Sequence, residues 1–232
     1  MTRSLSVLLS RILQISAATC LVALWLSGFA HETEIKTADP GFRPPSQYAP
    51  AFLESLDSAT IAVYPTIVRR ANRTAHSFAS QAQIIDSLNT ENIVTAVAGR
   101  RRIDLGRLLG TGSSQWEVFE NDMQGISEAL QKKGSDAQYH LVMEFLLPVS
   151  DQQIFGVHCY VLDQQGQSAF SFLLNSHHQL FVDANLMAAN SSEEARSNML
   201  ARATQVGVTA LEQQIKHARR VQTGVTLFEA PI

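Results

Sequence analysis

The chain has little cysteine, no basic excess and none of the short motifs that carry common catalytic chemistry. Its two cysteines are Cys20 and Cys159. If residues 1–30 are removed on export, Cys159 stands alone, so no internal disulfide can form and the fold must be stable through its core. A nucleophile elbow, an HExxH helix and a phosphate-binding loop are all missing. No motif therefore identifies an enzyme class.

The charge balance argues against nucleic acid as a partner. The chain carries 18 Lys and Arg against 21 Asp and Glu, a formal net charge of −3. Residues 1–30 contain two arginines and no acid, so the part after them has 16 basic residues and a net charge of −5. A domain that neutralises phosphates carries a basic excess or a concentrated basic face. The one basic run, Arg100-Arg101-Arg102, is interpreted as a solvated strand end.

The first thirty residues indicate export. Arg3 and Arg11 precede an uncharged run, 12–30, that ends at the small residue Ala30, which is the pattern of a secretion signal. The run is also close to the roughly 17 to 25 residues of a membrane-spanning helix. The segment can therefore be either a cleaved signal peptide or an N-terminal membrane anchor, and the sequence leaves both alternatives open. Cys20 lacks the small residue before it that a lipoprotein signal has. We expect the domain in the periplasm or on the outer face of the inner membrane.

The rest of the chain divides into three segments. Residues 31–50 contain four prolines and no apolar periodicity, which indicates a proline-rich linker. An α/β domain is expected over 51–220. Residues 221–232 are interpreted as a C-terminal tail with a possible edge strand.

Within the domain, the apolar periodicity predicts alternating strands and helices. Strands are expected over 60–68 and 92–105, where β-branched and apolar residues gather. A helix is expected from Ser77, because apolar residues recur every three or four positions. These residues are Phe78, Ala82, Ile85 and Leu88.

Capping boxes indicate where two further helices begin, at Ser114 with Glu117 and at Ser191 with Glu194. Between these helices, three strands over 138–147, 154–163 and 169–177 are predicted to form an antiparallel meander. The fold class is therefore α/β (α+β). We expect a single layer of about three helices packed on one face of a mixed five-stranded sheet.

An opening TIAVYP strand after an export signal and linker, followed by alternating elements and a late meander, resembles a known family. It is similar to the anticodon-binding-like domain of periplasmic envelope proteins, such as the TolB amino-terminal domain and the lipoproteins of curli secretion and peptidoglycan-synthase activation. The resemblance covers Thr60 to Arg219 in topology. It implies a non-enzymatic module that works through protein contacts in the envelope.

Strand parity divides the meander residues between two faces. The face expected to pack against the helices carries Tyr139, Leu141, Met143, Phe145, Leu147, Phe155, Val157, Cys159, Val161, Phe170, Phe172 and Leu174. The opposite face carries His140, Val142, Glu144, His158, Tyr160, Ser171, Asn175 and His177. A register that pairs residue 144 with 158, and 158 with 173, brings each set to one side.

This register places Glu144 directly across from His158, with Asn175 as a diagonal neighbour. Glu144, His158 and Asn175 are therefore the candidate catalytic residues, for general acid/base chemistry. His158, His177 and Glu144 are the candidate metal ligands, for zinc or another divalent ion. The alternative is a solvent-facing sheet surface with an ordinary cross-strand Glu/His pair.

Two functions follow from these patterns. The first is an exported binding or accessory module that contacts an envelope protein partner, uses no cofactor, and meets the membrane only through an uncleaved N-terminal segment. The second is a metal-dependent or acid/base hydrolase built on Glu144, His158 and His177. The lack of a recognised catalytic motif favours the first.

Overall fold

The computed structural model describes residues 41–42, 49–70, 73–103, 114–133, 136–148 and 152–222. The predicted signal or anchor segment and most of the linker lie outside these ranges. The chain divides into two compact units, Met1–Lys36 and Thr37–Ile232, and every described residue belongs to the second. Among the described residues, no helix is both long enough and apolar enough to cross a bilayer.

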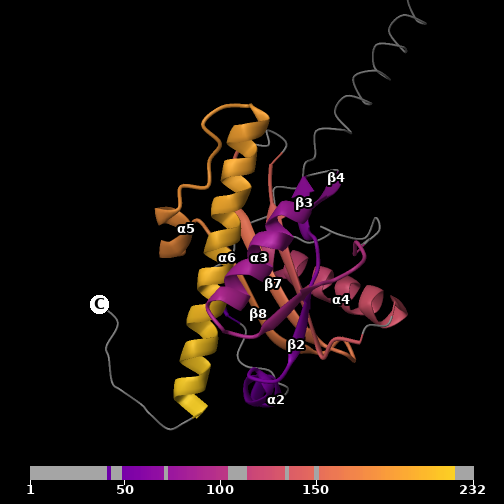
Figure 1. Cartoon of the computed structure of the whole chain (residues 1–232). Helices are drawn as coiled ribbons and strands as arrows, with labels where there is room; N and C mark the ends of the chain where they lie inside the picture. Colours follow the sequence, from indigo (N-terminus) through magenta and orange to yellow (C-terminus); the bar gives the residue numbers. More distant parts are fainter. Residues whose placement is uncertain are drawn as a thin grey trace, which may run out of the picture. The chain divides into compact units, whose positions relative to one another are not determined.

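In the described part of the chain, eight strands form one mixed sheet (Figure 1). Its path runs β1-β8-β7-β6-β2-β5, and β3, which pairs with β4, also lies along β6. The strands are β1 (Gly41–Phe42), β2 (Thr60–Val63), β3 (Thr66–Arg70), β4 (Arg73–Ser77), β5 (Thr95–Ala98), β6 (Tyr139–Leu146), β7 (Gly156–Asp163) and β8 (Ser168–Asn175). The helices are α2 (Ala49–Ser55), α3 (Phe78–Thr90), α4 (Gln115–Lys133), α5 (Gln179–Asp183) and α6 (Glu193–Gln222).

The strand predicted over 60–68 is two strands, β2 and β3, separated at Tyr64-Pro65. Both run parallel to β6, with Ile61 opposite Tyr139 and Ile67 opposite Glu144. Pro65 has no N–H to donate to a ladder, so the strand is interrupted there. The chain resumes as β3 along the second half of β6, which places Arg69 near Glu144.

The predicted meander and its register are confirmed. Glu144 pairs with His158 across β6 and β7, and His158 pairs with Leu173 across β7 and β8. The turn between β7 and β8 is stabilised by Asp163, whose Oδ1 accepts hydrogen bonds from the N–H groups of Gln165 and Gln167. Gly166 in this turn has φ +76°, a conformation that glycine adopts without strain.

The α+β fold class is confirmed, but the described residues form eight strands instead of five, and helices cover both faces of the sheet rather than one. In Figure 1, α3 and α6 lie in front of the strands and α4 lies behind them. In the front core, α2, α3 and α6 pack against the apolar side chains on one face of the meander, which include Met143 and Cys159. The second core packs Phe119 and Ile126 of α4 against Val142, Tyr160 and Leu173. These apolar side chains on the second face are what α4 buries.

The helix starts agree with the predicted caps, with small differences. Ser77 caps α3 by accepting a hydrogen bond from the N–H of Ser80, and Ser114 Oγ accepts one from the N–H of Glu117 in α4. For α6 the capping hydroxyl is that of Ser192, one residue after the predicted Ser191. The predicted apolar stripe of α3 is partly wrong, because Phe78 is 52% exposed. Its buried residues are Ser80, Gln81, Ile84 and Leu88.

Four short elements have no counterpart in the prediction: β1, α2, β4 and α5. β1 lies inside the predicted linker, where Gly41 and Phe42 pair with Leu173 and Phe172 of β8. At the other end, α6 extends to Gln222, so two residues of the predicted tail are helical. The possible edge strand in that tail lies outside the described residues.

Candidate functional site

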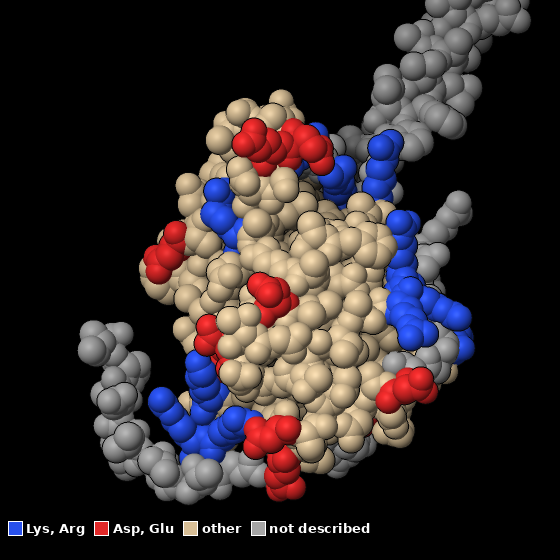
Figure 2. Space-filling model, in the orientation of Figure 1, with Lys and Arg blue, Asp and Glu red and all other residues tan. Residues whose placement is uncertain are grey.

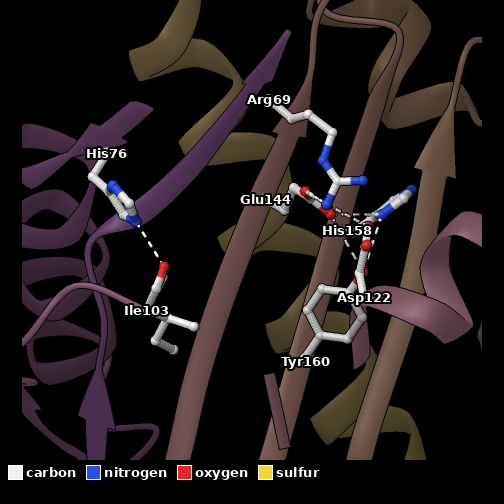
Figure 3. A network of polar contacts seen from close by, with 7 residues as sticks. All are labelled: Arg69, His76, Ile103, Asp122, Glu144, His158 and Tyr160. Carbon is white, nitrogen blue, oxygen red and sulfur yellow. Dashed lines mark hydrogen bonds and ion pairs between the residues drawn. The ribbon is translucent and has the colours of Figure 1, made fainter. Parts of the chain in front are cut away.

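A buried ionic cluster lies between the sheet and α4. It consists of Arg69 from β3, Asp122 from α4, Glu144 from β6, and His158 and Tyr160 from β7. Figure 3 shows these side chains converging from four elements that are distant in the sequence. Asp122, Glu144, His158 and Tyr160 have no exposed surface, and Arg69 is 8% exposed.

Arg69 and Glu144 are the centre of this cluster. Arg69 Nη2 lies 2.6 Å from Asp122 Oδ2 and 2.6 Å from Glu144 Oε1. The other carboxylate oxygen of Glu144, Oε2, lies 3.2 Å from His158 Nδ1 and accepts a hydrogen bond of 3.4 Å from the Tyr160 hydroxyl. One guanidinium therefore contacts two carboxyl groups, and the Glu144 carboxyl connects it to the histidine.

The spacing of residues in α4 explains how Asp122 reaches the sheet. Phe119, Asp122 and Ile126 are three and four residues apart, so they lie on one side of the helix. The Phe119 ring stacks on Tyr160 at a centroid distance of 4.7 Å and meets the edge of His158 at 5.1 Å. The aromatic contacts bring this side of α4 against β7, and Asp122 is buried with them.

Burial raises the pKa of both carboxyl groups. The pKa of Asp122 rises from 3.8 to about 8, first because of burial and then because of the neighbouring Glu144 charge, while Arg69 opposes the shift. The pKa of Glu144 is also raised by burial, with Arg69 the largest opposing influence. Near neutral pH Asp122 therefore keeps its proton in the folded protein, and Arg69 is the counter-charge beside Glu144.

The other members of the cluster are neutral or remain cationic for the same physical reasons. Burial lowers the pKa of His158 from 6.5 to about 3, so its imidazole is neutral. Burial raises the pKa of Tyr160 well above 10, so its hydroxyl keeps its proton. Burial opposes the charge on Arg69, but Glu144 and Asp122 outweigh burial and raise its pKa.

The predicted pairing of Glu144 with His158 is present, but the expectation of a solvent-facing surface is wrong because α4 covers it. Asn175 is buried at the end of β8, where its Nδ2 donates to Gln115 Oε1 at 2.9 Å and its Oδ1 accepts from the N–H of His177 at 3.0 Å. It therefore fastens the first turn of α4 to the sheet. His177 itself is exposed in the turn after β8.

The cluster contains a possible metal-ligand set that differs from the predicted one. Asp122, Glu144 and His158 offer ligand atoms that all lie within 4.8 Å of one another, with Asp122 in place of the predicted His177. The position between the carboxylates is already held by the Arg69 guanidinium, at 2.6 Å from each. A divalent ion would place a second cation against that guanidinium, so the side chains as arranged do not fit a metal.

Sequence reasoning missed Arg69 and Asp122, although each leaves a signal. Asp122 interrupts the apolar stripe of α4 between Phe119 and Ile126, and Arg69 follows the buried run 61–68. A charged residue at a position where the helix or strand pattern predicts a buried apolar residue is normally buried only together with an opposite charge. Two such charges of opposite sign predict an internal ion pair.

No model of a protein family and no curated protein matches this sequence. Among solved structures, the chain is similar to a chain of a PelC dodecamer from Paraburkholderia phytofirmans, with 10% identity over 72% of this chain and 96% of that chain. The TM-score is 0.31. A likeness this remote carries no argument about function.

Proposed function

We propose that this protein is an exported, envelope-associated binding module that acts through protein–protein contacts and not through catalysis. The observation that carries the proposal is the burial of the polar groups best suited to chemistry. Glu144 and His158 are fully buried, and α4 separates them from solvent. General acid/base catalysis requires a substrate within hydrogen-bond reach of the base.

The charge state of the cluster supports the same proposal. His158 is neutral, Asp122 keeps its proton near neutral pH, and the Arg69 guanidinium contacts both carboxyl groups. Each carboxyl group therefore has a positive charge beside it within the cluster. Such an arrangement is typical of a buried ion pair that gives two packed elements a unique relative position.

A surface near α5 offers a place for a protein partner. An open cavity of about 410 Å³ lies between the segment that follows α5 and the first turns of α6, lined by residues that include Met187, Asn190, Asn198 and Arg202. Met187 at its edge is 53% exposed, and Val182 on α5 is 55% exposed. Exposed apolar side chains among polar ones are typical of a protein interface, which has an apolar centre and a polar rim.

Photo-cross-linking in exporting cells tests this proposal. A photoreactive phenylalanine analogue at Met187 or Val182 of the full chain is expected to give one discrete adduct with an envelope protein. The same analogue at the exposed Lys132, near the end of α4, is the matched control and should give none. An adduct equally strong at all three positions, or none at any exposed position across the domain, would contradict a specific protein contact.

The second candidate function is the metal-dependent or acid/base hydrolase. It is supported by the short distances between the side chains of Asp122, Glu144 and His158. Its test is the metal content of the purified full chain after loading with zinc, measured by mass spectrometry. Near-stoichiometric zinc that is lost on Glu144→Gln would support the hydrolase and overturn the binding-only proposal. The Arg69 contacts predict no stoichiometric metal.

A further inference from the structure

Arginine side chains gather on one side of this acidic protein. Residues 58–85 and 92–103 contain six arginines and no Asp or Glu. Arg69 is the buried one, Arg70 is half-buried, and the others are exposed. Figure 2 shows Lys and Arg side chains gathered along the side where β4 lies in Figure 1. We define the arginine surface as Arg70, Arg73, Arg100, Arg101 and Arg102 together with the ring of Phe78.

The two segments that carry these arginines are fastened to each other. Arg70 and Arg73 are cross-strand partners at the end of the β3–β4 hairpin. His76 Nε2, on β4, donates to the carbonyl of Ile103 at 2.9 Å (Figure 3). Gln81 Nε2, in α3, donates to the carbonyl of Gly99 at 3.2 Å. Residues 99–103 are thus held against β4 and the start of α3, which brings the two segments to the same side of the domain.

An exposed aromatic ring belongs to the same surface. Phe78 at the first turn of α3 is 52% exposed, and the guanidinium carbon of Arg102 lies 5.3 Å from its ring centroid. This distance is within the range of a cation–π contact. A half-exposed Phe beside several guanidinium groups offers both an apolar contact and a high local positive charge.

We propose that the arginine surface docks this domain onto an anionic lipid bilayer. Guanidinium groups bind phosphate oxygens bidentately, and aromatic rings settle at the boundary between headgroups and acyl chains. A membrane is favoured over other polyanions because the uncharged run 12–30 predicts export across one, whether or not this segment is later cleaved. This proposal shares with the proposed function the export that the run 12–30 predicts, but it uses a different surface from the one proposed for the protein partner.

The test uses the full chain in vesicles with a reporter on the surface itself. Ala79 is exposed beside Phe78, so an Ala79→Cys variant on a Cys20→Ser background accepts an environment-sensitive fluorophore, while Cys159 stays buried. The vesicles are phosphatidylcholine alone, or phosphatidylcholine with one quarter phosphatidylglycerol. We expect a blue shift and a rise in intensity only with the anionic vesicles. High salt should abolish the shift, because the screening length falls to about 3 Å at 1 M.

Two matched variants make the result specific. The triple variant Arg73→Gln/Arg100→Gln/Arg101→Gln should lower the apparent affinity for the anionic surface roughly 100-fold, about fivefold per arginine. The triple variant Lys132→Gln/Lys216→Gln/Arg220→Gln removes the same charge elsewhere and should respond like the parent. A fluorophore at Val182→Cys, on α5, should not shift.

Three results would overturn the proposal. These are no shift with anionic vesicles, a shift that survives the first triple variant, or an equal shift at position 182. A response to RNA or polyglutamate in solution, without one to vesicles, would assign the surface to another polyanion. None of these results bears on cross-linking at Met187, so this proposal and the proposed function fail separately.

Discussion

Arg69 Nη2 lies 2.6 Å from a carboxylate oxygen of Glu144, and both side chains are buried. The two residues come from β3 and β6, and Asp122 of α4 completes the contact at the same nitrogen. This one guanidinium therefore links the sheet to the helix that covers it. Removing it would leave two buried carboxyl groups without a counter-charge, whereas the intact pair gives little net stabilisation beyond fixing the geometry.

We expect Arg69→Met to lower the free energy of unfolding by about 3–5 kcal/mol, because the partners of a buried ion pair are strongly destabilising when left alone. Urea titration of the full chain followed by circular dichroism measures the loss. Arg73→Met is the control, because Arg73 is exposed and such substitutions change stability by about 0.5 kcal/mol or less. The triple variant Arg69→Met/Asp122→Leu/Glu144→Met should recover much of the loss. A loss unchanged in the triple variant would show that packing, not charge, holds Arg69.

Stability is expected to fall between pH 6.5 and 8. Asp122 titrates near 3.8 when unfolded and at about 8 when folded, so across this window the folded chain keeps a proton that the unfolded chain has lost. Stability therefore decreases as pH rises. His158, whose pKa falls to about 3, acts in the opposite sense but only below pH 6.5. Its contribution is complete above that pH and is lost as pH falls.

The expected loss over this window is about 1–2 kcal/mol for one proton. Thermal unfolding at pH 6.5 and pH 8 measures it. In Asp122→Asn the difference between the two pH values should largely disappear, because the amide does not titrate. An equal difference in the variant would mean that another group causes the alkaline loss.

Cys159 should resist thiol reagents as long as the domain is folded. It is fully buried on β7, so a reagent cannot reach it. Burial also raises the pKa of its thiol, so the reactive thiolate does not form near neutral pH. In a Cys20→Ser full chain, labelling should begin only at urea concentrations that unfold the protein. The Arg69→Met variant should label at lower urea. Rapid labelling of the folded parent would place Cys159 in a region that opens locally.

Gly156 is expected to accept no side chain. A β-carbon there would overlap Nε2 of Gln115 and come within 3.0 Å of Leu146. Gly156→Ala should therefore displace the Gln115 side chain that accepts the hydrogen bond of Asn175, at a cost of about 1–3 kcal/mol. Urea unfolding measures the cost. Gly99→Ala, whose closest contact would be 3.0 Å to the carbonyl of Val63, should cost less. The opposite order would contradict the packing described around Gln115.

The pairing of Glu144 with His158 could be predicted from the sequence. Strand parity and register both follow from the alternation of apolar and polar residues along three consecutive strands. They could not predict what covers that face. Val142, Tyr160 and Leu173 share the face with the polar residues, and their apolar surface is what α4 buries. Asp122 and Arg69 were missed because each belongs to an element outside the meander, and their meeting depends on how α4 and β3 pack in three dimensions.

The ends of the domain are paired with each other, which affects how the fold can be assembled. β1, near the start of the folded unit, pairs with β8, and both α2 and α3 pack against α6, the last element described. Contacts between residues so far apart in sequence form slowly, since a long loop must close before they are gained. The contacts of α2 and α3 with α6 can form only after α6 has been synthesised. The last helix described therefore closes a core that the first helices cannot complete by themselves.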